Sequence, residues 1–209
     1  MKYTLFGKSV RALIRLFPVL FLLIALNCPA ADAASKASIN NKADALYMKK
    51  VQRLKKDVKS VWYKFTDITG DDIHEAVIFG KAITGSGNYW KIYTYKGGKT
   101  KLLFDGGEYG LDKLVVYKKT KSFYYHRAGH GWEATIFYQL KNGKYKQVAG
   151  KGRSFQGVRP GKWSYNNGKK AISKSAYNKL IRKYKRGKAA KMNPSKWPIE
   201  LVPENIYTG

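Results

Sequence analysis

Cysteine and negative charge are both scarce in this chain. Cys28 is the single cysteine among 209 residues, which excludes an internal disulfide and a cluster of metal-binding thiolates. Asp and Glu number 13 against 41 Lys and Arg, so the formal net charge is +28. A surplus of this size predicts contact with polyanions and says little about the fold. The alternative is a lysine coat that keeps the protein soluble.

Recognisable catalytic motifs are also missing. Gly85-Ser86-Gly87 lacks the Gly-x-Ser-x-Gly setting of a serine nucleophile. No glycine-rich phosphate loop with its Lys-Ser/Thr is present. Glu108 and Asp112 are candidates for an acid/base pair only because they are close in sequence, and solvated loop charges are the favoured interpretation. The sequence therefore predicts no enzyme class.

The first 33 residues have the layout of a bacterial-type secretory signal peptide. A basic start precedes an apolar run, Leu16–Leu26, and Ala31-Asp32-Ala33 supplies the small-x-small pattern that signal peptidase reads. This run is too short to span a bilayer, which needs about 20 apolar residues. We therefore expect residues 1–33 to be removed and the protein to act outside the cytoplasm, in the cell envelope or extracellular space.

Cys28 leaves a second processing route open, namely lipidation as in bacterial lipoproteins. Ala25-Leu26-Asn27 departs from the lipobox pattern, and Pro29 follows the cysteine directly. Cleavage after Ala33 is therefore the favoured prediction.

The remaining chain predicts one domain at residues 44–186, after a flexible segment at 34–43 and before a basic C-terminal extension at 187–209. Tyr47, Val51 and Leu54, continued by two valines, form an apolar stripe that predicts a helix over roughly 44–60. Ser173 is a capping residue for a second helix over about 174–186.

Between these helices, short runs of aromatic and β-branched residues alternate with turn residues, which indicates strands. Gly97-Gly98 and Asn142-Gly143 have the chemistry of two-residue hairpin loops. The expected strands lie near 61–66, 75–80, 88–96, 99–104, 112–117, 122–127, 134–141 and 144–149. This order predicts an α+β fold, mainly an antiparallel β meander in one curved or partly closed sheet, with a helix near each end of the chain.

Acidic residues gather in one short segment, residues 67–75. Crowded carboxylates repel one another unless a cation is nearby, and Ca²⁺ prefers several oxygens from one tight loop. The sequence therefore predicts a calcium site, and the alternative is a polar turn in which Asp67 bonds its own backbone. The candidate ligands are Asp67, Thr69, Asp71, Asp72 and Glu75.

The segment's pattern, Asp-x-x-Gly-Asp-x-x-x-Glu, is followed by the hairpin Tyr95-Lys96-Gly97-Gly98-Lys99. Over roughly residues 61–150 this resembles FG-GAP-like repeats and secreted proteins of unknown function from gut bacteria. The resemblance implies a small β module that is typically not catalytic. Thr69 and Asp72 depart from the family pattern, which has a carboxylate or Asn at the first position and Gly at the second. A full propeller would also need several such loops.

His126, His130 and Glu133 form a weaker candidate metal site. Histidines four apart share a face only on a helix, and Gly129 and Gly131 oppose a helix here. A glycine-rich hairpin loop with surface histidines is the favoured interpretation.

Tyr89, Lys91, Tyr93 and Tyr95 alternate along one expected strand and so share a face. An exposed aromatic and cationic strip of this kind stacks on sugars and meets anionic groups. The alternative is ordinary strand composition with half-buried tyrosines.

Together these features predict a secreted, non-catalytic module that binds an anionic glycan or envelope polymer through a basic, tyrosine-rich surface. Peripheral membrane contact through the basic first helix stays open, although its apolar face lacks Trp or Phe anchors. Secretion disfavours nucleic acid as the main partner. Two alternatives stay open: a structural accessory domain that binds a partner protein, and an envelope hydrolase with an unrecognised site in the loop from His126 to Glu133.

Overall fold

The computed structural model describes residues 35–55, 58–82, 88–106, 111–129, 131–157 and 159–201. The expected signal peptide, Cys28 and His130 lie outside these residues. Within the described residues no helix is both long and apolar enough to cross a membrane.

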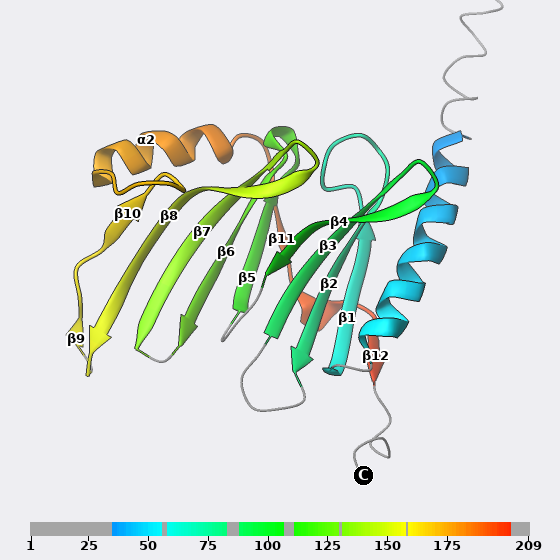
Figure 1. The fold of residues 1–209 in the computed structure, drawn as a ribbon, viewed down its shortest axis with the longest axis horizontal. Coiled ribbons are helices and arrows are strands. Elements are labelled where there is room, and N and C mark those ends of the chain that lie inside the picture. Colours follow the sequence, from blue (N-terminus) through cyan, green and yellow to red (C-terminus); the bar gives the residue numbers. More distant parts are fainter. Residues whose placement is uncertain are drawn as a thin grey trace, which may run out of the picture. The chain divides into compact units, whose positions relative to one another are not determined.

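Antiparallel strands dominate the described residues, and they form two sheets (Figure 1). The five-stranded sheet has the order β12-β1-β2-β3-β4. Its strands are β1 (Val58–Thr66), β2 (Glu75–Ala82), β3 (Asn88–Lys96), β4 (Lys99–Gly106) and β12 (Ile199–Leu201).

The seven-stranded sheet has the order β10-β8-β7-β6-β5-β11, with β9 paired to β8. Two short 3-10 helices, η1 (Lys118–Thr120) and η2 (Pro194–Lys196), follow β5 and β11 in the chain. The strands are β5 (Leu111–Tyr117), β6 (Ser122–Gly129), β7 (Trp132–Lys141), β8 (Lys144–Gln156), β9 (Arg159–Pro160), β10 (Ser164–Asn166) and β11 (Ala189–Met192).

The α+β class and the antiparallel meander are therefore confirmed, and each of the eight expected strands is present. Seven of them lie within three residues of their predicted bounds, whereas β8 continues to Gln156, seven residues beyond its predicted end. The two hairpin loops also form as expected, because Gly97, Gly98, Asn142 and Gly143 all have positive φ angles. In one respect the structure differs: the strands divide into two sheets, whereas one curved sheet was expected.

The N-terminal helix covers residues 35–54 and so differs from its expected bounds at both ends. Residues 35–43 are helical, not a flexible segment, because tertiary contacts hold them: Ala43 is fully buried, and the Asn40 side chain accepts a hydrogen bond from the His74 N–H. The helix stops before Val58 because Val58 and Val61 are β-branched residues that pair with β2. Both valines still pack in the same core as Tyr47 and Val51. The predicted apolar residues therefore share one core, although they belong to a helix and to the strand that follows it.

The second helix, α2 (Lys174–Tyr184), begins where expected, since the Ser173 side chain accepts a hydrogen bond from the Ala176 N–H. It lies along one face of the seven-stranded sheet, at the β7, β8 and β10 side (Figure 1). Tyr177 is its buried residue and packs with Phe137 and Ala149.

Residues 189–201 are part of the fold, which corrects the expected C-terminal extension. β11 pairs with β5 in one sheet, and β12 pairs with β1 in the other. Between them Trp197 packs edge-on against Trp90, with ring centroids 5.8 Å apart. These apolar and β-pairing residues outweigh the basic composition of the segment.

One apolar core joins the two sheets. It contains Trp90 and Ile92 from β3, Phe104 from β4, and Phe123 and Tyr125 from β6, all buried. Phe104 contacts Phe123 at a ring-centroid distance of 4.9 Å, so the end of β4 is fixed against the seven-stranded sheet.

We predict that Trp197→Ala lowers the free energy of unfolding by about 2–3 kcal/mol, because a partly buried tryptophan loses its core contacts. Urea denaturation measures this. Lys196→Ala is the matched control, since its side chain is exposed, and should change stability by less than about 0.5 kcal/mol. Equal effects of the two substitutions would mean that the C-terminal segment does not stabilise the core.

Candidate functional site

The acidic segment between β1 and β2 is a tightly hydrogen-bonded turn. The Asp67 carboxylate accepts hydrogen bonds from the backbone N–H groups of Thr69 (3.1 Å), Gly70 (2.6 Å) and Asp72 (3.0 Å). Asp72 has a φ of 66°, so it takes the bend position where the FG-GAP-like pattern has glycine. The acidic turn joins β1 to β2, and membership of the FG-GAP-like family stays a prediction.

Glu75 is fully buried at the base of this turn. Its carboxylate accepts from the Ile68 N–H (3.0 Å), the Thr69 N–H (3.2 Å), the Thr69 hydroxyl (3.3 Å) and the Thr94 hydroxyl (3.0 Å). Burial raises the pKa of Glu75 to about 7, although the Ile68 and Thr94 hydrogen bonds oppose this shift. The Glu75 oxygens therefore accept hydrogen bonds from the turn and from β3, inside the protein.

The cation of the acidic turn is a lysine. Lys118, in η1 of the other sheet, forms an ion pair with Asp67, and its Nζ lies 3.9 Å from Oδ1 of Asp72. Partial burial alone would raise the pKa of Asp67, but this ammonium and the backbone hydrogen bonds together lower it. Among the described residues no group of three or more His, Cys, Asp and Glu side chains is placed to hold a metal ion.

The expected calcium ligands form hydrogen bonds within the turn, and calcium binding by them stays a prediction. Ca²⁺ takes six to eight oxygens, but Asp67 and Glu75 already accept internal hydrogen bonds, and Asp71 accepts one from the Ile73 N–H (3.1 Å). The hydrogen bonds favour the polar-turn alternative.

The weaker candidate metal site is only partly described, because His130 lies outside the described residues. His126 and Glu133 lie on the neighbouring strands β6 and β7, and their side chains are 3.8 Å apart. Glu133 forms an ion pair with Arg153 of β8, and Nδ1 of His126 lies 3.2 Å from the Thr135 hydroxyl. The Arg153 guanidinium therefore neutralises Glu133, as Lys118 does for Asp67 in the acidic turn.

The tyrosine strip on β3 shares one face, as the alternation predicted, because Trp90 and Ile92 are buried on the other. However, Tyr89, Tyr93 and Tyr95 are half-buried against the N-terminal helix and β1, where they pack on the cluster of Tyr47, Val51 and Val61. This cover differs from the open strip that the sequence suggested. Sequence alone did not show that the helix would lie on this face.

Lys91, the cation of the strip, forms an ion pair with Asp105 at 2.6 Å. Its Nζ also lies 5.4 Å from the centroid of the Tyr89 ring. The Lys91 ammonium is therefore already paired with a carboxylate of the same sheet. Ligand binding by the strip of Lys91 and the three tyrosines stays a prediction.

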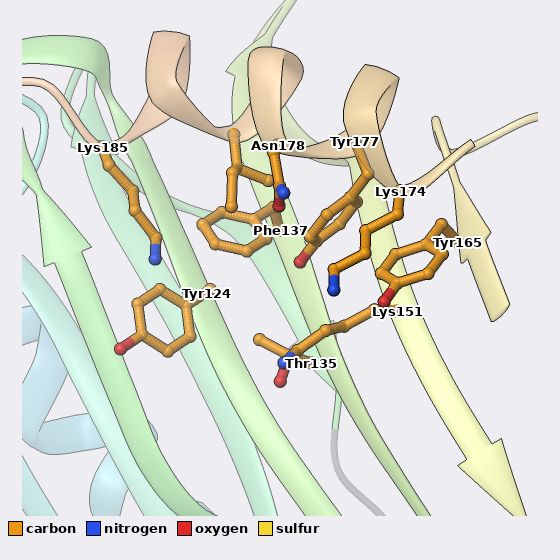
Figure 2. Close-up of a pocket in the computed structure, with 10 residues that line it drawn as sticks. Tyr124, Thr135, Phe137, Lys151, Tyr165, Lys174, Tyr177, Asn178 and Lys185 are labelled. Carbon is orange, nitrogen blue, oxygen red and sulfur yellow. The ribbon is translucent and has the colours of Figure 1, made fainter. Parts of the chain in front are cut away.

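A pocket that sequence reasoning missed lies between α2 and the seven-stranded sheet (Figure 2). Its volume is about 290 Å³. Side chains from β6, β7, β8 and β10 form its floor, and α2 forms its roof. The described residues that line it are Tyr124, Thr135, Phe137, Lys151, Tyr165, Lys174, Tyr177, Asn178, Ile181 and Lys185.

Strand register explains the pocket floor. His126 pairs with Thr135 and Thr135 pairs with Lys151, while Lys151 pairs with Tyr165, so these side chains form one row across four strands. The period-two alternation could have identified this row, but only once the strand order and the position of α2 were known.

The described charged side chains that line the pocket are all positive. Lys151, Lys174 and Lys185 line it, and none of the described lining residues is acidic. The pKa of Lys185 is lowered, first by partial burial and second by the like charge of Lys151. Its Nζ lies 5.4 Å from the Tyr124 centroid and 5.5 Å from the Phe137 centroid.

No family model, no curated protein and no solved structure matches this chain.

The raised pKa of Glu75 predicts a pH-dependent stability. In the folded state the group binds its proton up to about pH 7, while the unfolded state releases it near pH 4.5, so folding is weakened as pH rises between these values. The shift corresponds to about 3 kcal/mol. We expect Glu75→Gln to remove this fall in the free energy of unfolding, measured by urea denaturation from pH 4 to 8.

Asp71→Asn is the matched control for this titration, because Asp71 is an exposed carboxylate of the same turn. It should keep the wild-type pH dependence. If Glu75→Gln and the wild type showed the same slope between pH 4.5 and 7, Glu75 would not titrate as described.

The ion pair of Asp67 with Lys118 gives a prediction about calcium. Millimolar CaCl₂ should leave the melting temperature unchanged relative to NaCl of equal ionic strength, because Lys118 occupies the cation position. Asp67→Asn should cost about 1–3 kcal/mol of stability, since donors to the carboxylate lose an acceptor. A calcium-dependent rise in melting temperature that Asp67→Asn abolishes would restore the calcium hypothesis.

Proposed function

We propose that this protein is a secreted or envelope-associated, non-catalytic module that binds an anionic glycan or envelope polymer through its basic, tyrosine-rich surface. The proposal combines the secretory layout of residues 1–33 with the distribution of charge over the fold. The contact is electrostatic and so depends on which charges are left unpaired at the surface.

The proposal is carried by the observation that most of the described carboxylates are paired with cationic side chains or buried. Of the acidic side chains that the structure describes, Asp67, Asp105, Glu133 and Glu200 form ion pairs with Lys or Arg, and Asp44 pairs with His74. Glu75 is buried. Asp71 and Asp72 are exposed in the acidic turn, and Asp72 lies 3.9 Å from Lys118. Much of the described negative charge is thus paired or buried within the fold, and the large excess of lysine faces solvent.

The excess positive charge is widely spread, and it includes exposed lysines on both sheets and on α2. Examples on separate elements are Lys64 of β1, Lys99 of β4, Lys144 of β8 and Lys179 of α2. A mixed surface would be sufficient for solubility alone. A surface of nearly one sign attracts an extended polyanion at every point of contact.

An apolar docking surface receives less support. The large apolar side chains that are exposed in the described residues are Leu102, at 36%, and Ile199, at 45%. They lie on β4 and β12, at opposite ends of the strand order in the five-stranded sheet. Two separated side chains do not make the contiguous patch that a protein partner would need.

The test is binding to isolated bacterial cell envelopes, measured by co-sedimentation from low to high NaCl. Binding should be strong at low salt and fall steeply, because the screening length shrinks from about 30 Å at 0.01 M to about 3 Å at 1 M. An immobilised phosphate-bearing polysaccharide should reproduce this behaviour, and an uncharged dextran is the control.

Two results would contradict the proposal. Protein that stays in the supernatant at low salt would make the charge a solubility feature. Binding that resists high salt would indicate a protein partner held by apolar contacts.

A further inference from the structure

The pocket under α2 is more specific than a diffusely basic surface. Lys174 lies at the first residue of α2 and Lys185 directly follows its last, so the two lysines enter the pocket from opposite ends of its roof. Lys151 enters from the floor. Figure 2 shows the side chains of Lys174 and Lys185 extending from the helix toward the sheet.

Placing the ammonium groups of Lys151 and Lys185 at one hollow is electrostatically unfavourable in the unliganded protein. Partial burial and the charge of Lys151 already make it harder for Lys185 to carry its proton. An anion between helix and sheet would reverse this effect, since opposite charges attract strongly where water is partly excluded. The described pocket lining supplies no carboxylate for this purpose.

The residue type indicates which anion fits. A planar carboxylate is matched by the two-pronged guanidinium of arginine, whereas the pocket offers lysines, which act as compact point charges with rotatable donors. Three ammonium groups approaching from different elements suit a tetrahedral group whose free oxygens point in several directions. Phosphate and sulfate monoesters have this shape, and the phosphate carries close to two charges.

The size of the pocket indicates that the anion is attached to something larger. A water molecule occupies about 30 Å³ in the liquid, so 290 Å³ exceeds what one oxyanion fills. The rest of the lining contains the rings of Tyr124, Tyr165 and Tyr177. Aromatic rings pack on the apolar faces of sugars, and a few polar groups then fix the orientation.

Thr135 and Asn178 are the neutral polar groups of the lining, one on the floor and one in the roof. A hydroxyl and an amide both donate and accept hydrogen bonds, as the hydroxyl groups of a sugar require. The lining therefore combines cations for an oxyanion, rings for a sugar face and neutral groups for its hydroxyls.

We propose that the pocket between α2 and the seven-stranded sheet binds one sugar unit carrying a phosphate or sulfate monoester. This inference rests on the proposed function, since it names the chemical unit of the anionic glycan that the protein would recognise. Lys151, Lys174 and Lys185 contact the ester oxygens, and the tyrosine rings and Thr135 contact the sugar.

The experiment is isothermal titration calorimetry of the full chain with five probes: glucose 6-phosphate, glucose 6-sulfate, glucuronate, glucose and inorganic phosphate. The two monoesters should bind, and comparing them tells which ester is preferred. Glucuronate and inorganic phosphate should bind at least about tenfold more weakly, because each lacks one part of the recognised unit. Glucose should give no measurable heat.

The decisive variant replaces Lys151, Lys174 and Lys185 together with Gln, and it should abolish monoester binding. Its matched control replaces Lys64, Lys96 and Lys99 with Gln, which removes the same charge from exposed positions of the five-stranded sheet. The control should bind within about twofold of the wild type. Each single pocket variant, which is a milder change to the fold, should weaken binding by about tenfold.

The outcomes separate this inference from the proposed function. Failure of both monoesters to bind, or equal binding by the pocket variant and its control, would overturn the pocket assignment even if envelopes still bind in a salt-dependent way. Equal affinity for glucuronate would overturn the preference for a tetrahedral ester. Loss of envelope binding at low salt would contradict the proposed function, while the monoester titration would still report on the pocket by itself.

Discussion

The architecture depends on the paired carboxylates of the turn between β1 and β2. Glu75 holds the backbone of the turn from inside, and Asp67 holds it from outside while forming an ion pair with Lys118 of the other sheet. The N-terminal helix is attached to the same turn, because the Tyr47 hydroxyl donates to the His74 carbonyl at 2.7 Å. One short polar segment thus connects the helix and both sheets, and it lies where β1 ends and β2 begins.

Local structure was well predicted from the sequence because it follows from local chemistry. Alternating aromatic and β-branched residues defined the strands, glycine and asparagine defined the hairpins, and Ser173 defined the start of α2. The division into two sheets was not predictable in this way, because it falls between the consecutive strands β4 and β5, which lie in different sheets. Pairing over long sequence separations then adds β11 and β12 to the sheet edges. Val58 shows the difference: its periodicity fits a helix, but pairing with β2 places it in a strand.

The candidate sites illustrate the same limit. The sequence indicated a cation beside the acidic turn and suggested Ca²⁺, whereas the structure places Lys118 there, which is far away along the chain. The tyrosines of β3 share a face as predicted, but the N-terminal helix covers part of it. The pocket was missed because its lysines come from β8 and from both ends of α2, and no local spacing brings them together.

The last strands have a consequence for the order in which the protein folds. β12 pairs with the outer edge of β1, so the first strand of the chain acquires its second neighbour only when residues 199–201 have been made. Contacts of such large sequence separation form slowly, because a long loop must close before they stabilise anything. The edge of β1 that pairs with β12 therefore stays open until residues 199–201 are available, and the five-stranded sheet is completed only then.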